Sequence, residues 1–150
     1  MKFILTKELG RLVTWLRILG YDTQCFLGDK RASLMLRALQ DGRIIVTRTR
    51  QRAPSRGLRT VVIKNERVKE QLAELLKTLS IEPVSGMMFT RCTLCNTALK
   101  PKVKAEVKAL VPEYVFQTQE KFFICEKCSR VYWQGTHWGN VNSVLKEILG

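Results

Sequence analysis

The sequence predicts an α/β domain with a mainly parallel sheet flanked by helices, followed by a small domain organised around four cysteines. Two observations support this fold class. Short apolar runs alternate with segments of helical periodicity up to about residue 79, and two Cys-x-x-Cys pairs follow after residue 90. Alternating strands and helices favour right-handed crossovers between parallel strands. We expect the two domains to cover residues 1–82 and 83–150.

The elements of the first domain follow from the spacing of its apolar residues. Four runs rich in apolar and β-branched residues are expected to form strands, at residues 3–5, 23–26, 43–47 and 60–63. Apolar residues that recur every three or four positions predict helices near residues 9–19, 32–39 and 68–79. Gly20 and Gly42 follow the first two helices, where a glycine cap is typical.

The carboxyl ends of these strands are where the first domain should bind its ligands. In an open parallel sheet, ligands gather outside this edge. The predicted strands end at Thr6, residues 26–29, residues 47–49 and residues 64–65. We therefore expect any chemistry of the domain to involve side chains at these positions.

The second domain is expected to contain short strands and a C-terminal helix. Residues 114–116 and 121–124 should form paired strands, and residues 131–133 a further strand. Apolar residues at positions 141, 144, 145, 148 and 149 predict an amphipathic helix at the end of the sequence.

The four cysteines after residue 90 have the spacing of two metal-binding knuckles. Cys92 and Cys95 form one pair, Cys125 and Cys128 form the other, and residues 96–124 lie between them. Four thiolates complete a tetrahedral shell and leave no open position, so we predict a structural zinc ion in a zinc ribbon. The alternatives are four unrelated thiols or two redox dithiols, and iron can also occupy a site of four thiolates.

The chain is strongly basic, with 26 Lys and Arg against 13 Asp and Glu and a net charge of +13. Residues 43–59 contain no acid, and the arginines of this segment are Arg43, Arg48, Arg50, Arg52, Arg56 and Arg59. Because arginine binds phosphate oxygens in a bidentate manner, we predict that this segment contacts nucleic acid. The alternative is a solvated basic loop that serves solubility.

A second basic group lies beside the last cysteine pair. Lys127 and Arg130 precede Tyr132, Trp133 and Trp138, a combination suited to stacking of nucleic-acid bases. The same aromatic residues could instead fill the core of a small ribbon. His137 is the only histidine, and it either packs within the ribbon or touches RNA.

No segment approaches the roughly 18 to 20 apolar residues that a membrane-spanning helix needs. The first residues are too charged for a secretory signal. Cysteines in metal-binding pairs, together with Cys25 as a buried strand residue, suit a reducing compartment. We expect a cytoplasmic protein without a membrane partner.

Several segments together resemble a known family. They are residues 2–5, 9–12, 15–17 and 19–22 at the N-terminus, residues 42–48, and the stretches 91–96, 111–112, 125–128 and 132–138 around the cysteines. In combination they resemble the Mut7-C ribonuclease domain family. The resemblance implies a PIN-like α/β fold followed by a zinc ribbon. It also implies metal-dependent cleavage of RNA, in which clustered carboxylates hold Mg²⁺ or Mn²⁺ and the metal activates water.

The sequence departs from this family at the expected catalytic acids. Thr6 stands where the family has Asp after the first strand, and Thr49 stands where it has Asp after the central strand. Lys30 and Arg31 replace acids that enter the second helix. A threonine hydroxyl is neutral and is a poor ligand for Mg²⁺ by itself.

The acids that remain nearby are Glu8, Asp22 and Asp29, and they are the candidates for a rearranged metal site. Glu8 also suits the first turn of a helix, and Asp22 suits the turn after Gly20. Three hypotheses follow: an RNA-binding protein on a degenerate ribonuclease fold, an active Mg²⁺- or Mn²⁺-dependent ribonuclease with a rearranged carboxylate site, and a zinc-ribbon module that binds another protein.

Overall fold

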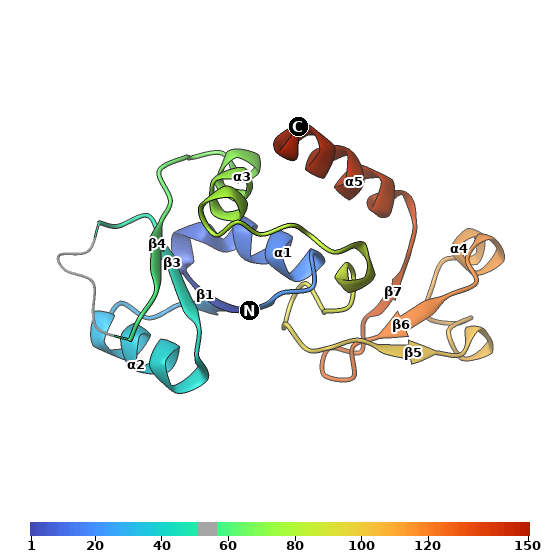
Figure 1. The fold of residues 1–150 in the computed structure, drawn as a ribbon. Helices are drawn as coiled ribbons and strands as arrows, with labels where there is room; N and C mark the ends of the chain where they lie inside the picture. The colour runs from blue at the N-terminus through green and yellow to red at the C-terminus, as the bar shows by residue number, and fades with distance from the viewer. Residues whose placement is uncertain (51–56) are drawn as a thin grey trace. The chain divides into compact units, whose positions relative to one another are not determined.

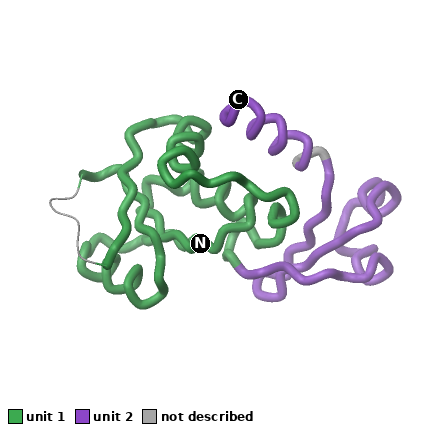
Figure 2. The backbone as a smooth tube through the Cα atoms, viewed as in Figure 1, with its two compact units in different colours: residues 1–96 green, residues 97–150 purple. Residues whose placement is uncertain are grey.

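The structure, a computed structural model, describes residues 1–50 and 57–150, apart from the side chains of Thr136 and His137. It divides into two compact units, residues 1–96 and residues 97–150 (Figure 2). The units divide after residue 96, whereas we expected a domain boundary after residue 82.

The first unit is an α/β unit with four parallel strands in the order β2-β1-β3-β4 (Figure 1). Its strands are β1 (Lys2–Thr6), β2 (Asp22–Phe26), β3 (Ile44–Thr47) and β4 (Thr60–Val62). Its helices are α1 (Gly10–Ile18), α2 (Arg31–Asp41) and α3 (Val68–Thr78), with the 3-10 turns η1 (Lys7–Leu9) and η2 (Ser85–Met87). This architecture confirms the predicted parallel sheet flanked by helices.

Helices cover both faces of the sheet (Figure 1). Helix α2 lies on one face, where Leu34 and Ala38 pack against Ile4, Phe26 and Ile45. Helices α1 and α3 lie on the other face (Figure 1). Successive side chains of a strand point to opposite faces, so a strand buried on both sides needs apolar residues throughout. The fully buried run from residue 3 to residue 5 meets this requirement.

Two glycines end helices in the left-handed conformation. Gly20 has φ +91° and Gly42 has φ +64°, which confirms both as C-terminal caps. Gly20 has a second constraint, because a Cβ atom built on it would lie 2.1 Å from the carbonyl oxygen of Met87. The segment after α3 therefore packs directly on the turn between α1 and β2.

The second unit contains an antiparallel sheet of three strands, in the order β5-β6-β7. Its elements are β5 (Lys100–Lys102), the 3-10 turn η3 (Lys104–Glu106), α4 (Glu113–Thr118), β6 (Phe122–Ile124), β7 (Val131–Trp133) and α5 (Thr136–Leu149). Val107, Val115 and Phe122 form its buried cluster, and Trp133 packs against that cluster. The expected strands at residues 121–124 and 131–133 and the terminal helix are confirmed.

One expected strand of the second unit is wrong. Residues 114–116 belong to helix α4, which Pro112 precedes with φ −58°. Proline just before a helix fixes a helix-compatible backbone, and Glu113 in the first turn favours the helix dipole. The strand that pairs with β6 is instead β5, whose Lys-Pro-Lys sequence lacks any apolar pattern. Proline is tolerated there because β5 lies at the edge of the sheet.

Among the described residues, no helix combines the length and the apolar character required to cross a bilayer.

Candidate metal centre and candidate nucleic-acid interface

The four cysteines of the two knuckles form one cluster. Their sulfur atoms all lie within 4.8 Å of one another, and Cys92 and Cys125 are buried. Four sulfurs at about 2.3 Å from a tetrahedral zinc ion would be about 3.8 Å apart. The cluster therefore fits a metal ion with little movement of the side chains.

The two knuckles have the same backbone turn. The N–H of Asn96 donates to the carbonyl of Cys92 at 2.9 Å, and the N–H of Ser129 donates to the carbonyl of Cys125 at 2.7 Å. Asn96 has φ +70° and Ser129 has φ +58°. In the second knuckle the N–H of Cys128 also points at Cys125 Sγ, at 3.3 Å. A backbone N–H directed at sulfur favours the thiolate, which is the form that binds metal.

The first knuckle is hydrogen-bonded to helix α1 through Arg17. This guanidinium is buried, and its Nη1 donates to the carbonyls of Thr93 and Leu94 at 3.0 and 2.9 Å. Its Nε donates to the carbonyl of Thr23 in strand β2 at 2.9 Å. One side chain therefore holds both residues between Cys92 and Cys95 and the start of an edge strand.

Asn96 attaches the end of the same knuckle to strand β2. Its Oδ1 accepts from the N–H of Thr23 at 2.9 Å, and its Nδ2 donates to Asp22 Oδ1 at 2.7 Å. Arg91 donates to the carbonyl of Asn96 at 2.8 Å and to that of Gly20 at 3.3 Å. These bonds explain why the first compact unit continues to residue 96.

The buried Arg43 and the half-buried Asp22 form an ion pair at the amino end of the sheet. Arg43 Nη1 lies 2.7 Å from Asp22 Oδ1 and also donates to the carbonyl of Phe3, and its side chain is only 6% exposed. Burial alone would raise the pKa of Asp22, but hydrogen bonds from Arg43 and Asn96 outweigh burial and lower it. Asp22 is in register with Lys2 at the start of β1, so it lies at the opposite edge from Thr6.

This geometry gives structural contacts to two of the residues singled out from the sequence. Asp22 neutralises a buried arginine and does not belong to the carboxyl edge of the sheet. Arg43 has its guanidinium largely enclosed by Asp22, Asp41 and a backbone carbonyl. Arg43 pairs with Asp22 because burying an arginine without a counter-charge would cost a large amount of folding free energy.

Threonines and Glu8 form a network at the carboxyl edge. Thr6 Oγ1 donates to Glu8 Oε1 at 2.6 Å and lies 3.2 Å from Thr47 Oγ1. The N–H groups of Thr49 and Arg48 donate to Thr47 Oγ1 and Glu8 Oε1, at 3.2 and 3.4 Å. Burial opposes ionisation of Glu8, but hydrogen bonds from Thr6 and the backbone lower its pKa. Glu8 is thus an ionised acceptor that ties the ends of β1 and β3 together.

Asp29 is exposed and paired with a lysine. Its carboxylate lies 2.7 Å from Lys7 Nζ, its side chain is 84% exposed, and the hydrogen bond from Lys7 lowers its pKa. Among the described residues, the four cysteines are the only group of three or more metal-ligating side chains. The structure therefore does not bring Glu8, Asp22 and Asp29 together into a carboxylate site.

The basic side chains of the carboxyl edge are more accessible than its acids. Arg48 and Arg50 follow β3 and are exposed, and Arg48 lies 3.9 Å from Glu66. An open depression of about 560 Å³ lies beside the end of β2, and Lys30, Ser33 and Arg37 are among its lining residues. Arg52 and Arg56 fall outside the described residues. In the second unit, Lys127 and Arg130 are exposed beside Cys128.

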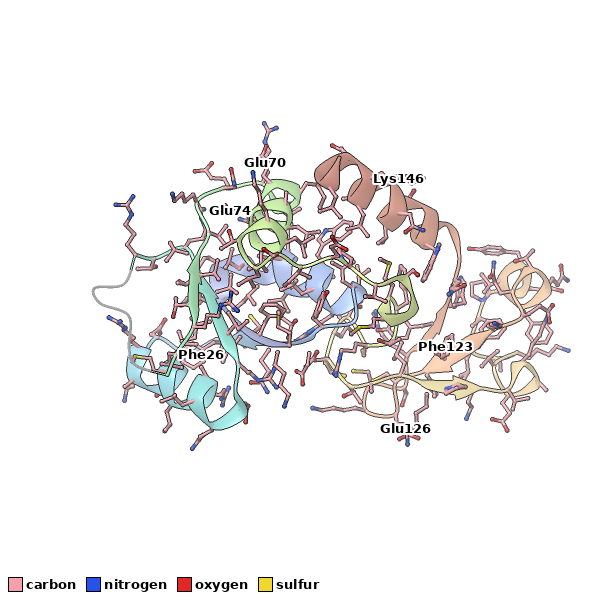
Figure 3. The ribbon with its side chains drawn as sticks, in the orientation of Figure 1. Phe26, Glu70, Glu74, Phe123, Glu126 and Lys146 are labelled. Carbon is pink, nitrogen blue, oxygen red and sulfur yellow. The ribbon has the colours of Figure 1, made fainter. Side chains whose placement is uncertain are left out.

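Three structural residues were missed by sequence reasoning: Arg17, Asn96 and Glu74. Glu74 lies on α3 (Figure 3). It accepts hydrogen bonds from the N–H groups of Lys64 and Asn65 and from the Asn65 side chain. Burial by itself would raise the pKa of Glu74, but these hydrogen bonds lower it. A signal did exist for Arg17, since it follows Val13 by four positions on the apolar side of the helix.

Cys25 is one of the residues that line the depression, and it is partly buried. Burial raises the pKa of its thiol. A thiol with a raised pKa is not an activated nucleophile, which agrees with its expected role as a strand residue.

The fold and the cysteine cluster define a protein with an α/β unit and a site for one metal ion. A family model described as the Mut7-C RNAse domain matches residues 1–145. The chain therefore belongs to the Mut7-C RNAse domain family, as its sequence motifs indicated. No curated protein and no solved structure matches the chain.

Proposed function

We propose that the protein binds RNA on a PIN-like ribonuclease fold without cleaving it, and that zinc occupies the four-cysteine cluster as a structural ion. The observation with the greatest weight is the network at the carboxyl edge of the sheet. The hydroxyls of Thr6 and Thr47 there are hydrogen-bonded to each other. The carboxylate of Glu8 accepts hydrogen bonds from the Thr6 hydroxyl and from the N–H of Arg48. A site for Mg²⁺ or Mn²⁺ needs several oxygen ligands that converge on one point.

The charge of the same edge favours a bound phosphate backbone. The exposed basic side chains there are Lys30, Arg37, Arg48 and Arg50, while Asp29 pairs with Lys7 and Glu66 lies 3.9 Å from Arg48. Replacing carboxylates with threonine removes repulsion of phosphate, so such an edge can hold a strand that it does not cut. The family supports RNA as the nucleic acid.

The binding test compares two double variants that remove the same charge. Arg48→Ala/Arg50→Ala alters the carboxyl edge, and Lys2→Ala/Lys77→Ala alters exposed residues at the start of β1 and in the last turn of α3. At roughly 0.7 per phosphate contact on single strands, the first variant should lower the slope of log affinity against log salt by about 1.4. The second should leave the slope close to the wild-type value. Equal slopes in the two variants would rule out the carboxyl edge as the binding surface.

The cleavage test separates a scaffold from an enzyme. Labelled RNA is incubated with zinc-loaded protein and Mg²⁺ or Mn²⁺, alongside the Asp29→Ala and Glu8→Gln variants. We expect binding without cleavage in all three proteins. Cleavage by the wild type that disappears in either variant would establish a rearranged carboxylate site. A third outcome is that the chain does not bind RNA but binds another protein with an affinity that does not change with salt. This outcome would favour the hypothesis of a zinc-ribbon module that binds a protein.

A further inference from the structure

We propose that Arg17 and Asn96 are positioning residues for the metal: they hold the first knuckle in its metal-binding turn and make metal binding depend on strand β2. The inference rests on the proposed metal ion in the four-cysteine cluster and is independent of the proposed RNA binding. It starts from a difference between the two knuckles, which have the same turn but different supports.

The support of the first knuckle consists of side chains far away in the sequence. Arg17 binds the carbonyls of Thr93 and Leu94, and Asn96 binds the N–H of Thr23 and the carboxylate of Asp22. The second knuckle has a local bond, in which the N–H of Cys125 donates to the carbonyl of Arg130. Its residue equivalent to Asn96 is Ser129, which is exposed. The first knuckle is thus preformed by the sheet.

Arginine is suited to this position by shape and by charge. Three carbonyl oxygens accept from one guanidinium, whose planar fork provides donors in fixed directions that a lysine cannot reproduce. A divalent ion with four thiolates has a net charge of −2, so a buried cation beside two of them also stabilises the loaded cluster.

Removal of such partners usually weakens metal binding by about 10- to 100-fold. A knuckle that is already folded loses less conformational entropy when the ion binds, which is the physical origin of the effect. The reciprocal consequence is that the metal stabilises the start of β2. The N–H of Thr23, which donates to Asn96 Oδ1, is the reporter of this effect.

The first experiment measures the affinity for Zn²⁺ by competition with a chelator, and the absorption spectrum of the Co²⁺-loaded protein. Asn96→Gly retains the left-handed backbone but loses both side-chain bonds, and Ser129→Gly makes the matched change in the second knuckle. We expect Asn96→Gly to lower the affinity by about 10-fold or more and to alter the Co²⁺ spectrum. Ser129→Gly should do neither. Equal affinities in the two variants would overturn the proposal.

Arg17→Met and Arg17→Lys are compared with Arg11→Met, which changes an exposed arginine on the same helix. We expect the affinity for Zn²⁺ to fall by up to about 100-fold in Arg17→Met, to recover partly in Arg17→Lys, and to stay unchanged in Arg11→Met.

If Arg17→Met does not fold, hydrogen exchange in the wild-type protein still tests the proposal. Removing Zn²⁺ should speed exchange at Thr23 more than at Ile4 and Ile45 in the centre of the sheet. Exchange that rises equally at all three amides would contradict the proposal.

Discussion

At the scale of single residues, ion pairs and hydrogen bonds separate the acids of the α/β unit into different roles. Asp22 balances the buried Arg43, Glu8 connects two strand ends, and Asp29 pairs with Lys7 on the surface. All three have a lowered pKa, although the causes differ. A lowered pKa therefore reflects a stabilising contact here and is not by itself a sign of catalysis.

The Asp22–Arg43 pair predicts a pH dependence of stability. Because the pKa of Asp22 is lower in the folded state, its contribution is complete above the unfolded value of about 3.9 and is lost as pH falls through the folded value. Asp22→Asn should reduce the free energy of unfolding at neutral pH by about 2 kcal/mol, since hydrogen bonds between charged groups contribute roughly that much. Urea denaturation between neutral and acidic pH measures both effects.

Asp41→Asn is the control for this prediction. Asp41 lies 3.3 Å from Arg43 Nε but is 42% exposed, so solvent screens the interaction. Its replacement should change stability by well under about 1 kcal/mol. The loss of stability in acid should also be shallower in Asp22→Asn than in the wild type. An equally steep acid loss in that variant would assign the pH dependence to other carboxylates.

At the scale of elements, glycines determine where the crossovers turn. Gly20→Ala would force an alanine into φ +91° and place its Cβ against the Met87 carbonyl. We expect the free energy of unfolding to fall by at least about 2 kcal/mol, because the backbone is strained and the segment that contains Met87 must move. Gly42→Ala is the matched variant, because Gly42 has φ +64° but no atom within 4 Å of a Cβ. It should cost only about 1 kcal/mol. Thermal unfolding that ranks the variants in the reverse order would disprove the packing argument.

The α/β unit was predictable at this scale because its signals are local. Strands buried on both faces require continuous apolar runs such as residues 3–5, and each glycine cap ends its own helix. The second unit shows the limit of such signals. Residues 114–116 have strand propensity, but Pro112 and the packing of Val115 against Val107 and Phe122 favour a helix.

The candidate site could be predicted only where one short motif contains the chemistry. Two Cys-x-x-Cys pairs are sufficient to predict a metal cluster, which the structure assembles. The hydrogen bonds of Arg17 and Asn96 join positions more than 70 residues apart in the sequence. No local pattern encodes such pairs. The pair of Arg43 with Asp22 has no local signal either, because the two residues lie 21 positions apart in the sequence.

At the scale of the whole molecule, the two units differ in how much apolar core supports them. The sheet of residues 1–96 encloses most of the buried apolar residues. In residues 97–150 the buried apolar side chains are Val107, Val115, Phe122, Cys125, Val141 and Leu145. Small domains with so little core usually depend on a metal or on disulfides.

Metal removal should therefore affect the two units unequally. Structural zinc contributes on the order of 10 kcal/mol to folding in zinc-finger peptides, which matches the whole stability of an ordinary domain. We expect chelation at neutral pH to abolish the slow hydrogen exchange of β6 and β7, while the amides at the centre of β1 and β3 remain protected. Cys125→Ser should reproduce this result in the presence of zinc, and Cys25→Ser should not. Protection of β6 and β7 that survives both chelation and Cys125→Ser would mean that residues 97–150 fold without the ion, and that the cluster has a function other than structural support.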